Sequence, residues 1–150
     1  MVNCRILFLD DDENRHSEVV YTFNRRCQAF KAIGVNIHLD RVYSADEAIK
    51  KLEFTKKYTL VCLDHDLELT KIIGHEYVSG MAVAEYIAYL MPTLLTPSWV
   101  HIHSWNGPAA ERMEATIRES QVRYISHQPF ESQTRYWDSL FQKAAELSKQ

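Results

Sequence analysis

Apolar and polar positions alternate along this chain in two distinct patterns. Short apolar runs such as Cys4–Leu9 and Tyr58–Leu63 are continuous and stop abruptly at an aspartate, as is typical of strands buried on both faces of a sheet. Longer segments such as Glu13–Ile33 place apolar residues three or four positions apart, which predicts amphipathic helices. Gly34, directly after that segment, indicates where the helix ends.

The two patterns follow one another along the whole chain. The expected strands are Cys4–Leu9, Asn36–Val42, Tyr58–Leu63, Trp99–His103 and Gln121–Ile125. The expected helices are Glu13–Ile33, Ala45–Phe54, Gly80–Leu90, Pro108–Ser120 and Gln133–Lys149. Five successive strand–helix units predict an α/β fold, with a five-stranded parallel sheet and helices on both faces. The expected strand order is 2-1-3-4-5, in a single domain covering residues 1–150.

Composition and charge narrow the class of protein. Apolar residues make up 46% of the 150 residues, charged residues 25%, and the net charge is -3, so no overall basic field indicates a nucleic-acid-binding protein. The three cysteines show no CxxC spacing, which fits a reducing compartment. No segment reaches the roughly 20 apolar residues that a membrane span needs. We therefore expect a soluble cytoplasmic protein without a membrane partner.

Polar side chains with candidate chemistry follow four of the expected strands. In such sheets ligands bind at the carboxyl ends of the strands, where the strand order reverses. The residues at those ends are Asp10, Asp11, Asp12, Asp64, His65, Asp66, His101, His103, Ser104, Asn106, His127 and Gln128. So many carboxylates close together require a cation or shared protons. The pattern predicts a divalent metal ion, with Mg²⁺ or Mn²⁺ favoured and Zn²⁺ possible because imidazoles are nearby.

The histidines and the tryptophan of the fourth strand region have separate interpretations. His101 and His103 are two positions apart on a strand, so they project to the same face. His101 is interpreted as a hydrogen-bonded core histidine, and His103 as a metal ligand or general acid/base. For His65, a chemical role and plain exposure stay equally open. For Trp105, packing against the sheet is favoured over stacking on a base.

The segment ILFLDDDENR resembles the start of two-component receiver domains, which have a flavodoxin-like fold. That resemblance implies that the acidic pair after the first strand holds Mg²⁺, that a later aspartate accepts phosphate, and that another aspartate offers its backbone carbonyl to the metal. The matching residues are, in that order, Asp10 with Asp11, Asp64, and Asp66. Ser104 matches the hydroxyl residue that contacts the phosphoryl group. In the last motif, ISHQPF, Gln128 stands where receivers have lysine, which weakens the interpretation as a phosphorylation switch.

Three motifs resemble a narrower group, the cyclic-phosphate processing receiver-like domain. They are LDDDENR (Leu9–Arg15), LDHDL (Leu63–Leu67) and HIHSWN (His101–Asn106), and they stand in order at strand ends. The resemblance implies processing of cyclic phosphates, on a small phosphorylated ligand such as a cyclic nucleotide or at an RNA end.

Three functional hypotheses follow. The first is metal-dependent phosphodiester hydrolysis, with a cation on Asp10, Asp11, Asp64 and Asp66. In it, Asp64, His103 and His65 are catalytic, and Ser104, Asn106 and Gln128 bind phosphate oxygens. The second is a degenerate receiver that acts as a non-catalytic signalling or nucleotide-binding module. The third is a haloacid-dehalogenase-like phosphatase, because Asp10 and Asp12 form a DxD pattern after an apolar strand. The sequence does not predict the oligomeric state.

Overall fold

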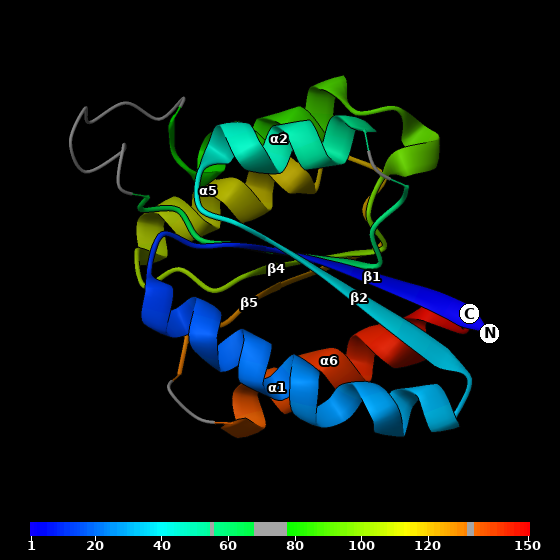
Figure 1. Cartoon of the computed structure of the whole chain (residues 1–150). Coiled ribbons are helices and arrows are strands. Elements are labelled where there is room, and N and C mark those ends of the chain that lie inside the picture. The colour runs from blue at the N-terminus through cyan, green and yellow to red at the C-terminus, as the bar shows by residue number, and fades with distance from the viewer. Residues whose placement is uncertain (55, 68–77, 132–133) are drawn as a thin grey trace.

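The computed structural model describes residues 1–54, 56–67, 78–131 and 134–150. Its centre is a parallel sheet of five strands in the order β2-β1-β3-β4-β5 (Figure 1). The strands are β1 (Val2–Leu9), β2 (Val35–Val42), β3 (Leu60–Leu63), β4 (Trp99–Ile102) and β5 (Tyr124–His127). The predicted fold class and strand order are confirmed.

Helices cover both faces of the sheet and make three layers (Figure 1). One face carries α1 (Glu13–Ala32) and α6 (Thr134–Ser148). The other carries α2 (Ala45–Phe54), α4 (Gly80–Glu85) and α5 (Gly107–Ile117). Each expected helix is present, although α4 passes into a π-helical turn at Tyr86–Leu90 instead of continuing as an α-helix. A backbone hydrogen bond of 2.9 Å from Met91 N to Tyr86 O closes that wider turn.

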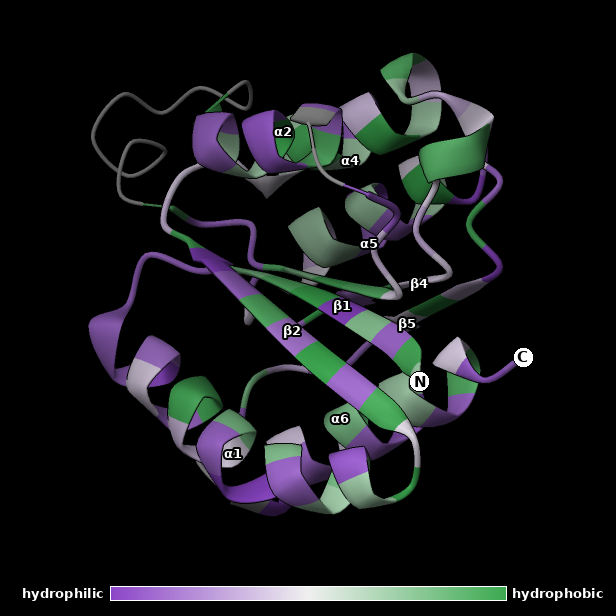
Figure 2. Ribbon diagram, turned by 45° about the vertical axis from the view of Figure 1, so that its right-hand side comes forward, coloured by the Kyte–Doolittle hydropathy of each residue, from purple (hydrophilic) through white to green (hydrophobic). Residues whose placement is uncertain are grey.

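Successive residues of the central strands face opposite layers. On β1, Leu7 and Leu9 belong to the apolar cluster under α2, α4 and α5, whereas Ile6 and Phe8 belong to the cluster under α1 and α6. All four side chains are buried, which explains why β1 appears in the sequence as an unbroken apolar run. β2 lies at the edge of the sheet and alternates between hydrophilic and hydrophobic residues (Figure 2).

The fifth strand begins three residues later than expected. β5 begins at Tyr124, which pairs with Trp99 of β4, whereas the apolar pattern placed the strand at Gln121–Ile125. Val122 is apolar because it packs against the core ahead of the strand, so it does not mark a strand residue. The shift places His127 at the end of β5, beside the loop after β4. Among the described residues, no helix has both the length and the apolarity to cross a bilayer.

Candidate functional site

Asp10 follows β1 and is fully buried at the carboxyl end of the sheet. Its Oδ2 accepts hydrogen bonds from Arg15 Nε at 2.7 Å and His103 Nε2 at 2.9 Å, and its Oδ1 accepts one from the backbone N–H of Asp12 at 2.8 Å. Burial alone would raise the pKa of Asp10, but these bonds outweigh it and lower the pKa to about 2. Asp10 is therefore a carboxylate at any physiological pH.

Asp12 and Arg15 are fixed by the start of α1. Asp12 caps the helix, since its Oδ1 accepts from the backbone N–H groups of Asn14 and Arg15 at 2.8 and 3.1 Å. The guanidinium of Arg15 then reaches back over the strand ends. Besides Asp10, it lies 3.9 Å from Asp11 Oδ1 and 3.7 Å from Asp64 Oδ2. One guanidinium thus lies within 4.0 Å of three carboxylates.

Asp64 follows β3, the neighbour of β1, and only 6% of it is exposed. Burial raises its pKa to about 6, and the neighbouring His103 and Arg15 oppose that rise only in part. The backbone at Asp64 is also closely covered. A Cβ added to Gly80 would lie 1.9 Å from the Asp64 carbonyl oxygen, so only glycine fits at the start of α4.

The LDHDL and HIHSWN motifs meet through a chain of hydrogen bonds. His65 is buried, and its Nδ1 lies 2.7 Å from Asp66 Oδ1. The side-chain amide of Asn106 donates to both carboxylate oxygens of Asp66 at 3.3 Å. Asn106 is itself held by the helix that it caps, since its Oδ1 accepts from Ala109 N at 3.2 Å. A carboxylate that is fixed in this way orients the imidazole beside it.

His103 lies behind Asp10 in the interior of the domain. Its ring stacks on Phe8 at a centroid distance of 5.1 Å and meets Trp137 edge to face at 5.9 Å. Nε2 contacts Asp10, and within the described part of the chain Nδ1 has no hydrogen-bond partner. With 1% of the residue exposed, His103 holds Asp10 in position from inside the protein.

The predicted phosphate-binding residues line the loops after β4 and β5. Ser104 is buried, and its Oγ accepts from the backbone N–H of Asn106 at 3.1 Å. His127 Nε2 lies 3.3 Å from the Ser104 carbonyl, so the ends of β4 and β5 are joined there. The side chain of Gln128 is exposed.

Trp105 is 69% exposed, so the expectation that it packs against the sheet is wrong. It stands in the turn between β4 and the helix cap at Asn106. The other two tryptophans, Trp99 and Trp137, are buried as expected. An exposed indole ring beside the predicted phosphate ligands is available for stacking on a base.

Three of the predicted metal ligands come together. One oxygen from each of Asp10, Asp11 and Asp64 lies within 4.8 Å of the others. The carboxylate of Asp66 is not part of this group, because it binds His65 and Asn106. The role expected of Asp66, a backbone carbonyl offered to the metal, stays a prediction. The donor set consists of oxygen atoms only, which suits a hard divalent cation. The geometry fits such an ion, which would compete with Arg15 for the same oxygens.

Several residues that shape the site were not predicted. The sequence shows Arg15 only as part of a motif, although its place four residues after Asp11 puts it one helical turn from the acidic run. His16 is buried and binds the Asp10 carbonyl through Nε2 at 2.7 Å. Burial lowers the pKa of His16, so this imidazole supports the strand end as a neutral donor.

His101 belongs to a second network, which fits its interpretation as a core histidine. Ser126 Oγ accepts from Trp99 Nε1 at 2.8 Å and lies 2.7 Å from His101 Nδ1. His101 Nε2 lies 2.7 Å from the hydroxyl of Tyr136, which donates to the Gln128 carbonyl at 2.6 Å. Burial first, and neighbouring positive groups second, lower the pKa of His101 to about 3, so it stays neutral.

Comparison with known families agrees with the three motifs. The profile of the cyclic-phosphate processing receiver domain matches residues 5–119, which include all three. The chain belongs to this family. The predicted membership of the cyclic-phosphate processing receiver domains is thereby confirmed. No curated protein matches the chain.

Solved structures of response regulators share the fold at low sequence identity. NtrX from Brucella abortus has a TM-score of 0.59 and 20% identity, over 98% of this chain and 28% of that one. The chemotaxis response regulator CheY4 of Vibrio cholerae has a TM-score of 0.57 and 12% identity, over 94% and 98%. The BeF3-activated DrrB receiver domain has a TM-score of 0.56 and 14% identity, over 97% and 99%. This family member thus spans about a quarter of NtrX, and these likenesses show the fold alone.

Proposed function

We propose that this domain is a metal-dependent phosphoesterase that opens cyclic phosphates. The proposal rests on an acidic cluster and an oriented imidazole that lie at the same edge of the sheet. Asp10, Asp11 and Asp64 offer oxygens within 4.8 Å of one another, and the residue after Asp64 is an imidazole oriented by a carboxylate. The first suits a cation and the second suits proton transfer. A phosphorylation switch needs no oriented imidazole.

The cation site is assigned to Asp10, Asp11 and Asp64, with Mg²⁺ or Mn²⁺ favoured and Zn²⁺ as the alternative. A divalent ion held there would neutralise charge on phosphoryl oxygens and lower the pKa of a bound water. Arg15 now compensates the same three carboxylates, at 2.7 to 3.9 Å. Its side chain is partly exposed and reaches the site from α1, so it can yield these oxygens to an ion or contact a phosphate itself.

Opening a cyclic phosphate requires one proton to leave the attacking water and one to reach the ester oxygen that is released. As the oxygen of water bonds to phosphorus, the bond from phosphorus to one ring oxygen breaks. We assign His65 to this proton transfer, with Asp66 and Asn106 as the residues that orient it. His103 acts through Asp10, which it holds in place, so it is a positioning residue in this proposal.

Substrate contacts are assigned to the loops after β4 and β5. Ser104, Asn106 and Gln128 would bind phosphate oxygens. Asn106 is already bound to Asp66, so its share in this is smaller than that of the exposed Gln128. Trp105 offers an exposed ring on which the base of a nucleotide can stack. These groups together favour a nucleotide ligand over inorganic phosphate.

The test is incubation of the purified protein with 2′,3′-cyclic AMP and Mg²⁺, Mn²⁺ or Zn²⁺, followed by separation of the products. We expect metal-dependent ring opening that falls by a factor of roughly 100 or more in Asp64→Asn and His65→Gln. The control is Asp46→Asn, which makes the same change to an exposed carboxylate on α2. Ring opening that is equal in all variants, or absent with every metal, contradicts the proposal.

The alternative of a non-catalytic binding module is favoured by Gln128, which stands where receivers have lysine. In the same assay it predicts saturable binding of the cyclic nucleotide without products. The phosphatase alternative has less support. Its DxD pattern needs Asp10 and Asp12 at one site, whereas Asp12 is used to cap α1.

A further inference from the structure

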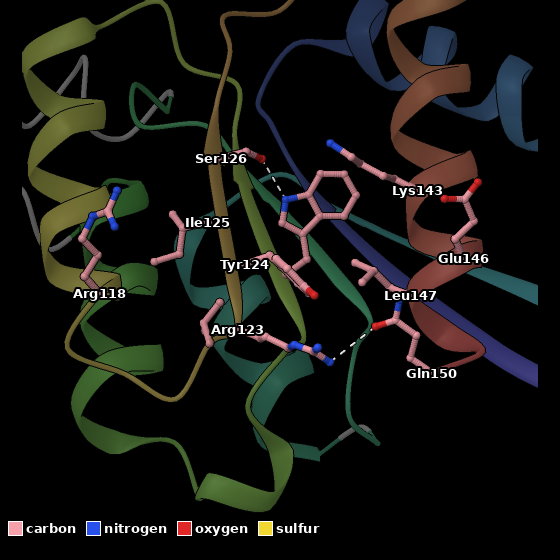
Figure 3. Close-up of a pocket in the computed structure, with 11 residues that line it drawn as sticks. Arg118, Arg123, Tyr124, Ile125, Ser126, Lys143, Glu146, Leu147 and Gln150 are labelled. Atoms are coloured by element: carbon pink, nitrogen blue, oxygen red, sulfur yellow. Dashed lines mark hydrogen bonds between the residues drawn. The ribbon is translucent and has the colours of Figure 1, made fainter.

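A groove runs along the outer edge of the sheet, between the end of α5 and α6. Its central cavity has a volume of about 710 Å³, and β5 passes through the middle of it. Figure 3 shows Arg118 on one wall, Lys143 and Leu147 on the opposite wall, and Tyr124 and Ile125 of β5 between them. None of these residues belongs to the acidic cluster.

Two smaller cavities continue the groove in both directions. A cavity of about 310 Å³ shares Trp99, Ser126 and Lys143 with the central one and extends to His127 and Gln128. A cavity of about 300 Å³ shares Arg123 and Tyr124 with the central cavity at its other end. The groove therefore follows β5 along its whole length and ends at the predicted phosphate-binding residue Gln128.

The groove is basic although the chain as a whole is acidic. The charged residues lining the three cavities are Lys57, Arg118, Arg123, Arg135, Lys143, Glu131 and Glu146. Five cations thus line the groove with two carboxylates, in a chain with a net charge of -3. Of the five, Arg118 is also paired with Glu114 of α5 at 2.5 Å, so the positive charge of the groove rests on the others. Positive charge gathered along one groove of an acidic protein attracts a polyanion to that groove.

Two of these cations lie against aromatic rings at the centre of the groove. The guanidinium carbon of Arg123 lies 5.0 Å from the centroid of the Tyr124 ring, and Lys143 Nζ lies 5.8 Å from that of Trp99. Among the described residues, neither cation has a carboxylate within 4.0 Å; Arg123 reaches only the neutral amide of Gln150, at 3.4 Å. Tyr124 is 39% exposed. Cations without carboxylate partners beside an exposed ring suit a phosphate backbone with a base stacked near it.

We propose that this groove binds the sugar–phosphate backbone of single-stranded RNA and leads the end of the strand toward Gln128 and Ser104. The choice of RNA rests on the proposed function, because a 2′,3′-cyclic phosphate forms only where a 2′-hydroxyl is present. His127 connects the groove to the site, since it lines the cavity next to Gln128 and contacts the Ser104 carbonyl at 3.3 Å. A free cyclic nucleotide would occupy the site alone and leave the groove without a function.

The experiment measures fluorescence anisotropy of a labelled single-stranded RNA of roughly 12 nucleotides ending in a 2′,3′-cyclic phosphate, across a range of salt concentrations. The test variant is Arg123→Gln with Lys143→Gln. Removal of two phosphate contacts should weaken binding roughly tenfold near 0.1 M salt and reduce the slope of log affinity against log salt by about 1.4. Turnover of 2′,3′-cyclic AMP should stay unchanged, because neither residue belongs to the acidic cluster or to the residues assigned to bind the cyclic phosphate.

The matched control is Lys31→Gln with Lys51→Gln, which removes the same charge from exposed positions outside the groove. Equal weakening by both double variants would overturn the proposal, since it would show only a general charge effect. The proposal is also wrong if RNA does not bind. It is wrong as well if the test variant changes the molecular mass of the protein measured by analytical ultracentrifugation and leaves RNA binding intact. The last result would mean that a second copy of the chain covers β5. If cyclic AMP is not opened at all, the hydrolase proposal fails, but loss of RNA binding in the test variant alone still supports the groove.

Discussion

His103 Nε2 lies 2.9 Å from Asp10 Oδ2, and this contact joins residues that are 93 positions apart in the chain. Both side chains are buried. The contact explains why the first acidic motif and the histidine motif occur in the same protein, because the carboxylate at the end of β1 would otherwise lack a buried donor. Asn106 and Asp66 connect the histidine motif with the LDHDL motif in the same manner.

His103→Phe should destabilise the fold by about 3 to 5 kcal/mol near neutral pH, because it leaves the buried Asp10 carboxylate without one of its donors. Phenylalanine keeps the ring that stacks on Phe8. The pKa of Asp10 is lowered to about 2, so the stability gained from its ionised form is present above about pH 4 and is lost as the pH falls toward 2. Urea unfolding at pH 7 and pH 3 should therefore show a smaller effect at pH 3. A comparable loss in His38→Phe, at a partly exposed histidine of β2, would contradict this explanation.

Asp64→Asn should stabilise the fold at pH 7.5, by up to about 3 kcal/mol. Burial raises the pKa of Asp64 to about 6, so ionisation of this group destabilises the folded state, and stability decreases as the pH rises from about 4 to 6. Asparagine resembles the protonated form and can still accept the hydrogen bond from His65 N. At pH 3, below the pKa of the unfolded carboxyl, the difference in unfolding free energy should nearly vanish. A variant that is less stable than the wild type at pH 7.5 would show that the ionised carboxylate stabilises the fold.

Arg15→Gln should make the domain depend on a divalent ion. Without the guanidinium, Asp10, Asp11 and Asp64 repel one another, so the melting temperature in a chelator should fall. Added Mg²⁺ or Mn²⁺ should then raise it by more than in the wild type, since no side chain competes for the oxygens. Arg25→Gln is the control, because it breaks an ion pair with Asp138 on another part of the surface. An equal metal response in wild type and Arg15→Gln would mean that the ion does not bind at these carboxylates.

The sequence predicted the fold and the acidic cluster for the same reason. Apolar runs that end at aspartates locate the ends of buried strands, and parallel strands bring their ends to one edge of the sheet. That logic placed Asp10, Asp11 and Asp64 together, as the structure has them. It does not predict which way a side chain in the following loop points, so it could not show that the Asp66 carboxylate binds His65 and Asn106.

The residues that were missed depend on contacts with distant parts of the chain. Arg15 looks like an ordinary charged helix residue until α1 is seen to begin directly above the strand ends. Trp105 follows a buried strand and resembles its buried neighbour Trp99, and only the turn at the end of β4 shows that its ring is uncovered. The sequence does not indicate that position 80 requires glycine, because the steric restriction on Gly80 comes from the carbonyl oxygen of Asp64.

Gly80→Ala should therefore be among the most damaging small substitutions in this domain. The added methyl group would lie 1.9 Å from the Asp64 carbonyl oxygen and 3.0 Å from the His65 Cα, so the backbone that carries both residues must shift. We expect a loss of at least about 2 kcal/mol in unfolding free energy, as for overpacking in a rigid interior. Metal binding should weaken too, because Asp64 moves with its backbone.

Gly107→Ala is the matched control. Gly107 is also the first residue of a helix, but no atom lies within 4 Å of a Cβ added to it. That variant should be as stable as the wild type or slightly more stable. If thermal unfolding shows equal changes in both variants, the close approach between α4 and the end of β3 does not hold Asp64 in place.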